Sequence, residues 1–312
     1  MSSRPDGGTS RTRDRPGGAG GLRAFLRAAN GLGSRVAEDV WTAAASRVRR
    51  RPGDVRRWTT TGRERVLVIA AHPDDEAMGC AGSILRHRRA GDAVQVVIVT
   101  DGSLSRAYGL SGDVIAAHRR NEAREAAARM DVASEWVGLE EGRWTDADGS
   151  AAIRGSLRAT SPTIVYAPSA IDYHPEHRRV AAAVAAALTE TGARPEVRIY
   201  AVQVPLTSLL VNLVHDVSDI DHAVRRALAA YATQRESIAR TLRLRRYAAR
   251  VHGGGDAAEA FCAMPAALFC ELHRRPPASF RPLRIRAWTD PLAAVMGTRE
   301  RIAWRRRLGP GP

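Results

Sequence analysis

The residues best suited to chemistry in this chain are a histidine and the acids that follow it after an apolar run. Residues 66–71 are apolar and rich in β-branched types, which is typical of a buried strand in a parallel sheet. His72 ends this run, a proline follows, and then come three acids, which suit a helix N-terminus. The pattern predicts His72 at the carboxyl end of a strand and Asp74 and Asp75 on the first helical turn. Open α/β sheets bind their ligands at that edge.

One histidine and two carboxylates at a strand end could hold a metal ion and keep one carboxylate for proton transfer. The simpler alternative is that the acids only cap the helix. A second cluster argues against this alternative, because the strand-like run 163–168 leads to His174, Pro175, Glu176 and His177 and then to a helical run. The same order of residue types therefore occurs twice.

The elements that must position these residues alternate between strands and helices from Arg65 onward. We expect strands at 66–71, 94–100, 135–139, 163–167 and 197–204, and helices at 76–90, 113–130, within 145–159, and at 175–188. This alternation predicts a Rossmann-like α/β domain with a mostly parallel sheet and helices on both faces. For the rest, we expect a buried strand or an apolar loop at 204–214, helix at 219–250, a helical turn at 257–261 and a last strand at 267–272.

The positive charge of the chain is concentrated in its two ends. The formal net charge is +15, and residues 1–62 and 273–312 each carry a net +8, whereas residues 63–272 carry −1. We expect a basic N-terminal extension at 1–62, disordered at first and then amphipathic-helical, one domain at 63–272, and a Pro- and Arg-rich tail at 273–312 with a short helix at 291–308. The basic helices could contact an anionic membrane, or pack on the domain or a second subunit.

Composition restricts the cell compartment and the class of protein. The three cysteines, Cys80, Cys262 and Cys270, form no C-x-x-C pair, so we expect neither a disulfide framework nor a Cys-ligated zinc. We find no signal peptide and no apolar run of about 18 residues, which predicts a cytoplasmic protein, or one peripheral to the inner membrane face. The alternatives are a nucleic-acid-binding protein, which the near-neutral central region disfavours, and a nucleotide-binding Rossmann-like protein, which would need G-x-G-x-x-G after the first strand.

The motif AHPDDE at 71–76, followed by HPEH at 174–177, resembles the PIG-L/LmbE-like family of zinc-dependent N-deacetylases. The resemblance covers roughly residues 65–272. Three further landmarks agree with it: Thr100-Asp101-Gly102, Arg119-x-x-Glu122 and Tyr231-Ala-Thr-Gln234. The chain departs from the family at Glu176, where Asp is usual, and at Thr233, where Ser is usual.

The resemblance implies a cofactor, an activity and the main site residues. His72, Asp75 and His177 would be the metal ligands, Asp74 the general base, and His174 a proton donor or oxyanion stabiliser. The cofactor would be zinc or another divalent metal. The activity would be hydrolysis of an N-acetyl or other N-acyl group on an amino sugar, such as a GlcNAc-containing glycoconjugate.

Other residues are expected around this centre. Glu176 would orient His174 or a metal ligand, although it could equally be a helix-start acid. Four residues are expected to contact the substrate: Asp101, Arg106, Arg119 and Tyr173. For Arg119, the alternative is a structural pair with Glu122.

Overall fold

The computed structural model describes Val40, residues 55–274 except 171, 173, 203, 204, 207 and 254, and residues 298–308. The strands are β1 Arg56–Arg57, β2 Arg65–Ala70, β3 Ala93–Thr100, β4 Ala133–Leu139, β5 Ile164–Ala167, β6 Glu196–Ile199, β7 Leu213–Asp216 and β8 Ala258–Pro265. The α-helices are α2 Asp75–Ala90, α3 Gly112–Met130, α4 Asp146–Thr160, α5 Pro175–Thr191, α6 Asp221–Leu228, α7 Arg235–His252, α8 Ala266–Arg274 and α9 Thr298–Leu308. Short 3-10 turns lie at η1 Ala107–Gly109, η2 Ser218–Ile220 and η3 Ala232–Gln234.

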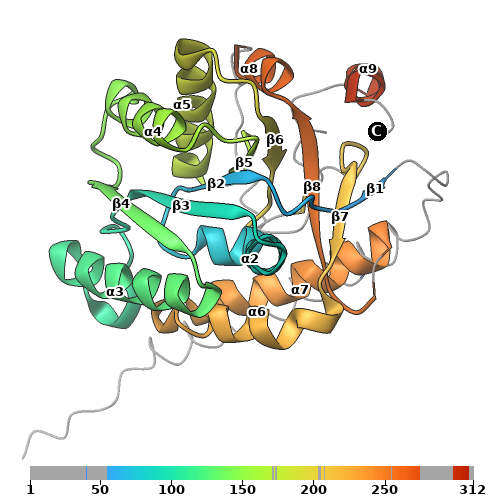
Figure 1. Cartoon of the computed structure of the whole chain (residues 1–312). Helices are drawn as coiled ribbons and strands as arrows, with labels where there is room; N and C mark the ends of the chain where they lie inside the picture. Colours follow the sequence, from blue (N-terminus) through green and yellow to red (C-terminus); the bar gives the residue numbers. More distant parts are fainter. Residues whose placement is uncertain are drawn as a thin grey trace, which may run out of the picture.

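The strands of the described residues form one eight-stranded sheet in the order β1-β7-β8-β6-β5-β2-β3-β4 (Figure 1). Among the described strands, only β8 runs antiparallel to its neighbours, which are β6 and β7. The chain moves outward from β2 to β3 and β4 and then returns to β5 on the other side of β2. The predicted α/β fold with a mostly parallel sheet is confirmed, and its change of direction lies between β2 and β5.

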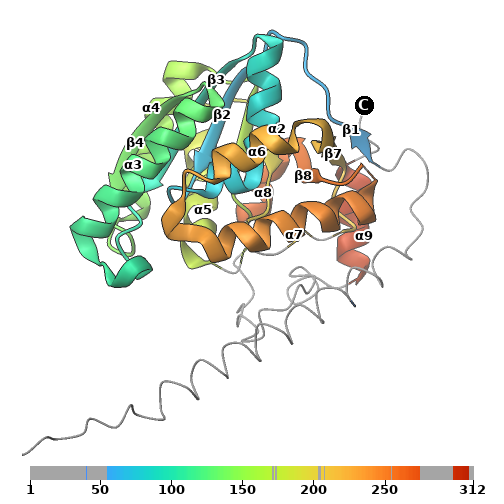
Figure 2. The same ribbon diagram turned by 90° about the horizontal axis from the view of Figure 1, so that it is seen from below.

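Helices cover both faces of the sheet. α4, α5 and α8 lie on one face, and α2, α3, α6 and α7 lie on the other (Figure 1, Figure 2). The strand β2 contributes to both hydrophobic cores, because Leu67 and Ile69 pack into the first and Val66 and Val68 into the second. Burial on both sides explains why this strand is continuously apolar in sequence.

Two expectations near the C-terminus are wrong. Residues 257–261, expected as a helical turn, enter the strand β8, and residues 267–272, expected as a strand, belong to the helix α8. The free edge of β6 pairs with β8 in antiparallel register, and this tertiary pairing overrides the local helical preference of an Ala-rich segment. The following segment, AALFCELHR, is rich in helix-forming residues and continues as a helix once the sheet edge is filled.

The helix α9 packs against the domain. Trp304 is only 3% exposed and lies in the core that contains Met264 and Phe269. Arg307 donates to Glu271 at 2.6 Å. The helix expected at 291–308 is confirmed from Thr298, while residues 291–297 lie outside the described part. The boundaries proposed for the domain and its tails stay predictions.

The expected N-terminal helices fall outside the described residues, apart from Val40, which is helical. Among the helices that the structure describes, none combines the length and the apolar character that crossing a bilayer requires.

Candidate metal centre

The carboxyl ends of two neighbouring strands bring the predicted site residues together. His72 follows β2, and Asp75 begins α2. His174 is the N-cap of α5, which follows β5, and His177 lies in its first turn. Because the chain changes direction between β2 and β5, their ends flank a crevice of the kind in which α/β proteins bind ligands.

Three donor atoms form a compact triangle in this crevice. His72 Nδ1 lies 3.2 Å from His177 Nε2 and 3.3 Å from Asp75 Oδ2, and Asp75 Oδ2 lies 3.2 Å from His177 Nε2. All three side chains are buried. A tetrahedral zinc ion with ligand distances of about 2.0–2.1 Å separates its ligand atoms by roughly 3.3–3.4 Å. The triangle therefore has the size and the donor chemistry that such an ion requires.

A wider grouping includes the third histidine. Ligating nitrogens of His72, His174 and His177 all lie within 4.8 Å of one another, so the three imidazoles could hold a metal ion. The Nδ1 of His174 is engaged elsewhere, because it accepts a hydrogen bond of 3.3 Å from the backbone N–H of Glu176. A neutral imidazole that accepts through Nδ1 carries its proton on Nε2.

Each imidazole of the triangle has a carboxylate behind it. His72 Nε2 lies 3.1 Å from Glu141 Oε1, and His177 Nδ1 lies 3.1 Å from Asp172 Oδ1. Metal-binding histidines usually carry such a partner on their second nitrogen, which fixes the ring and its tautomer. The sequence analysis did not select Glu141 or Asp172. Their one signal in the sequence was an acid just beyond a strand, β4 for Glu141 and β5 for Asp172.

These contacts raise the pKa of both histidines and lower the pKa of Asp75. Burial alone would lower the pKa of His72, but hydrogen bonds to Asp75 and Glu141 outweigh burial and raise the pKa to about 9. Burial would also lower the pKa of His177, but Asp75 and Asp172 outweigh burial and hold the pKa well above its usual value. For Asp75, burial would raise the pKa, but the two histidines hold it well below 3.8. Opposite charges on the two histidines and on Asp75 thus favour the short distances between them.

Asp74 lies beside the triangle in an unusual backbone conformation. It occupies the N-cap of α2 with a φ of 140°, a value that non-glycine residues rarely adopt and that occurs mainly at functional sites. Its Oδ2 lies 3.2 Å from a guanidinium nitrogen of Arg119. Burial raises the pKa of Asp74 to about 7, although the charge of Arg119 acts in the opposite direction. The sequence placed Asp74 on the first turn of the helix, whereas the structure places it one residue earlier, at the N-cap.

The carboxylate of Glu176 is hydrogen-bonded to residues other than the three histidines. It accepts hydrogen bonds from the indole of Trp144 and from the guanidinium of Arg179, which stacks on the same indole at 3.8 Å from the ring centroid. Only the backbone N–H of Glu176 reaches His174. The orienting role expected for Glu176 stays a prediction, with the backbone as the contact that the structure shows.

Of the four residues expected to contact substrate, only Arg119 lines the pocket in the described structure. It also donates to Pro73 O at 2.9 Å and to Gly102 O at 3.2 Å. A Cβ at Gly102 would lie 2.3 Å from the Arg119 guanidinium, so a glycine is needed there. Asp101 accepts backbone hydrogen bonds from Ser103 and Glu141. Arg106 is exposed, and Tyr173 lies outside the described residues.

Two of the sequence landmarks, Glu122 and Tyr231, make hydrogen bonds to residues around the site. Glu122 accepts hydrogen bonds from the backbone and the hydroxyl of Thr233, which ties α3 to η3. Tyr231 donates to Glu76, whose other oxygen accepts the backbone N–H of Asp74 at 3.2 Å. Burial raises the pKa of Glu76 to about 8.

The triangle and Asp74 open into a pocket of about 470 Å³. Besides the charged residues, its walls include the apolar side chains of Met78, Leu104 and Val202 and the neutral polar side chains of Gln234 and Ser237. The volume lies in the range of about 300–1,000 Å³ that small-molecule sites usually have.

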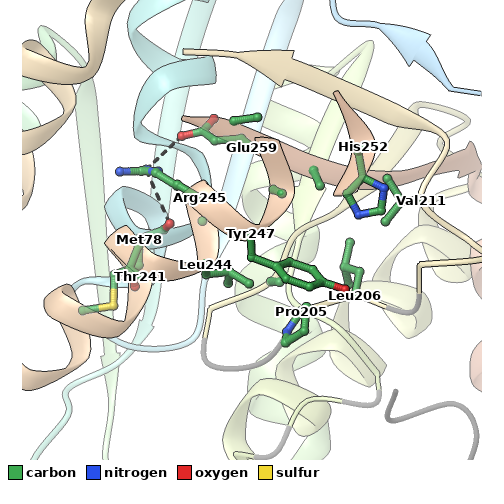
Figure 3. Close-up of a pocket in the computed structure, with 15 residues that line it drawn as sticks. Met78, Pro205, Leu206, Val211, Thr241, Leu244, Arg245, Tyr247, His252 and Glu259 are labelled. Atoms are coloured by element: carbon green, nitrogen blue, oxygen red, sulfur yellow. Dashed lines mark hydrogen bonds and ion pairs between the residues drawn. The ribbon is translucent and has the colours of Figure 1, made fainter. Parts of the chain in front are cut away.

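Met78 also lines a second cavity, of about 30 Å³, which is shown in Figure 3. Arg245 reaches into it from α7 and pairs with Glu259 at 2.9 Å. The same nitrogen donates to the backbone oxygen of Ala77 at 3.1 Å. This buried pair therefore holds the first turn of α2, which carries Asp75, against the sheet.

Comparison with known proteins agrees with the motifs. Residues 67–188 match the family model described as PIG-L: GlcNAc-PI de-N-acetylase. The matched segment contains all three residues of the triangle as well as Asp74 and His174. Residues 67–188 are therefore similar to the PIG-L family, and the resemblance inferred from the sequence is confirmed.

A curated relative is a 1D-myo-inositol 2-acetamido-2-deoxy-alpha-D-glucopyranoside deacetylase from Kineococcus radiotolerans, which is 29% identical over 160 residues. The match covers 40% of this chain and 44% of that protein. The aligned part thus spans less than half the length of this relative.

Solved structures share the fold. The N,N'-diacetylchitobiose deacetylase from Pyrococcus horikoshii has a TM-score of 0.56 at 19% identity and covers 83% of this chain and 97% of its own. A 4-carboxy-2-hydroxymuconate hydratase from Pseudomonas putida has a TM-score of 0.54 at 19% identity, with coverages of 64% and 95%. Since this fold occurs in a deacetylase and in a hydratase, the function has to be argued from the site.

Proposed function

We propose that this protein is a zinc-dependent N-deacetylase that releases an acyl group from an N-acylated amino sugar. The observation that carries the proposal is the triangle of His72, Asp75 and His177 beside a fourth, buried carboxylate, Asp74, in one pocket. Two nitrogens and one oxygen from the protein leave one tetrahedral position open, as in catalytic rather than structural zinc sites.

The remaining residues have roles that follow from their positions. A bound zinc ion would supply water with a pKa near 7, close to the working pH. Asp74 is not part of the triangle, so its carboxylate is free to take a proton from that water and to return it to the departing amine. His174 lines the same pocket, and its Nε2–H can donate a hydrogen bond to the oxygen of the amide as negative charge develops there.

The substrate class rests on the family and on the named relatives. The matched family is described by its de-N-acetylation of a GlcNAc-containing substrate, and the relative from Kineococcus radiotolerans is named for a 2-acetamido-2-deoxy sugar. A pocket of about 470 Å³ can admit one sugar ring with its N-acyl group. Membrane contact through the N-terminal extension and a cytoplasmic location remain predictions from the sequence.

The test is amine release. The purified protein is incubated with a panel of N-acetylated amino sugars, with and without a chelator, and free amine is measured together with metal content. We expect about one zinc per chain and amine release that the chelator abolishes and added zinc restores. Release that is unaffected by complete metal removal would refute the mechanism, and no release from any member of the panel would refute the proposed substrate class.

A further inference from the structure

One short segment contacts both halves of the metal centre. Residues 141–144 follow β4, and Glu141, at the start of this segment, lies 3.1 Å from the imidazole of His72. Trp144, at its end, donates through its indole Nε1–H to Oε2 of Glu176 at 2.5 Å. Glu176 lies in the first turn of α5, the helix that begins with the other two histidines of the site. The segment therefore links the start of α5 to the histidine that follows β2.

The indole of Trp144 is held in place on more than one side. Its side chain is 6% exposed, and a Cβ added at Gly149 in α4 would lie only 2.4 Å from its ring. The guanidinium of Arg179 stacks on the indole and donates to the backbone oxygen of Trp144 at 2.5 Å. Arg179 also donates to Oε1 of Glu176 at 3.0 Å. Each oxygen of the Glu176 carboxylate thus has its own donor, and the two donors are fixed to each other.

This arrangement fixes the backbone that orients His174. The backbone N–H of Glu176 donates to Nδ1 of His174 at 3.3 Å, which leaves the proton of a neutral ring on Nε2. The backbone N–H of His174 itself donates to Asp172 at 2.8 Å. A displacement of Glu176 would weaken its contact with Nδ1 and allow the ring to rotate or to change tautomer. Because a donor stabilises developing charge only when it is aligned with that charge, such a displacement should lower the rate.

We propose that Trp144 is a positioning residue, which acts through Glu176 to hold His174 in the orientation that the reaction needs. The inference rests on the proposed function, because that function gives the Nε2–H of His174 its role. An effect transmitted by His174 cannot exceed the effect of removing this imidazole. The alternative is that Trp144 only fills the core beside α4, and in that case its effect on the rate would not depend on His174.

A double-mutant cycle tests the proposal. Trp144→Phe removes the Nε1–H and keeps an aromatic ring, so kcat for amine release should fall about five- to tenfold with little change in KM or zinc content. In a His174→Ala background, the same substitution should change kcat by less than about twofold. Trp58→Phe is the matched control, since Trp58 also donates through Nε1, to the hydroxyl of Tyr166 at 2.9 Å. This control should leave kcat unchanged in both backgrounds.

Two kinetic results would overturn the proposal. Equal losses of kcat in the two backgrounds would show that Trp144 acts independently of His174, and a wild-type kcat in Trp144→Phe would show that the indole donor is not needed.

Long-range proton–nitrogen NMR spectra of the histidine rings separate this inference from the proposed function, because they need no substrate. The His174 signals, identified by their loss in His174→Ala, should show the proton on Nε2 in the wild-type protein. They should move or broaden in Trp144→Phe and stay unchanged in Trp58→Phe. This result without amine release from any substrate would leave the positioning contact standing and refute the deacetylase. Unchanged His174 signals in Trp144→Phe would overturn the positioning role.

Discussion

Tyr231 donates a hydrogen bond to Oε1 of Glu76, and both side chains are buried. Through Oε2, the same carboxylate accepts the backbone N–H of Asp74. The tyrosine is thereby connected to the strained residue that we propose as the general base, although it lies far along the chain. This contact gives Tyr231 a positioning role without any contact with the substrate.

Tyr231→Phe tests this role. The variant removes the hydroxyl and leaves the ring, so Glu76 loses one partner and holds the Asp74 backbone less firmly. We expect kcat to fall by about tenfold with little change in KM or in zinc content, because a lost buried hydrogen bond costs about 1–3 kcal/mol. Tyr247→Phe is the matched control, since it removes a buried hydroxyl from the second cavity. Equal losses of kcat in both variants would indicate general destabilisation.

Asp74→Asn tests the proposed base. Asparagine preserves the shape of the side chain but cannot accept the proton of water, so kcat should fall by about 10²–10⁴-fold while zinc content and folding stay normal. Metal analysis and steady-state kinetics on one preparation give both quantities. Loss of zinc would show that Asp74 is a ligand, and near-full activity would place the base elsewhere.

Alanine substitutions distinguish the metal ligands from the remaining histidine. His72→Ala, Asp75→Ala and His177→Ala should each lose zinc and activity, because each removes one corner of the triangle. His174→Ala should keep its zinc and lose rate, by about 10²–10³-fold if the imidazole stabilises developing negative charge. Full zinc occupancy in His177→Ala would mean that His177 is not a ligand and that His174 binds the metal in its place, together with His72 and Asp75.

Local sequence signals located His72 and the acids beside it, but they did not identify the residues and elements that hold this group in place. His72, Asp74 and Asp75 could be placed because a strand end, a proline and a helix start are local signals. Glu141 could not, since its contact with His72 depends on β4 and β2 ending at the same edge of a sheet whose strand order the sequence does not state. The segments that became β8 and α8 were misassigned for a similar reason, because pairing with β6 decided their structure.

The Glu259–Arg245 pair predicts how stability changes in acid. Burial alone would raise the pKa of Glu259, but the charge-stabilising contacts to His215, Arg245 and the Gly82 N–H hold it at about 2. Because the folded pKa lies below the unfolded value of 4.5, the stabilisation is complete above about pH 4.5 and is lost as the pH falls toward 2. The loss amounts to roughly 3 kcal/mol.

Urea unfolding at pH 5 and pH 3 measures this effect. Glu259→Gln combined with Arg245→Met avoids leaving one buried charge unpaired. The double variant should lose less stability than the wild-type protein between the two pH values. Identical losses would show that other acids dominate this range.

Trp304→Ala tests whether α9 is part of the folded unit. The indole is 3% exposed, and removing a buried aromatic side chain typically costs about 3–5 kcal/mol. Ile302→Ala, at a position 41% exposed on the same helix, should change the free energy of unfolding by less than about 0.5 kcal/mol. Similar unfolding curves for the two variants would mean that α9 contributes little to stability in solution.

The position of β8 has a consequence for the order in which the chain can assemble as it is made. In the described sheet, β8 lies between β6 and β7, and β1 pairs with β7. The strands β2 to β6 can pair as they emerge during synthesis, in keeping with the N-terminal-first folding of growing chains. The pair β1–β7 cannot join them through the sheet until Pro265 has emerged, so β1, the first of the described strands, is among the last to be incorporated.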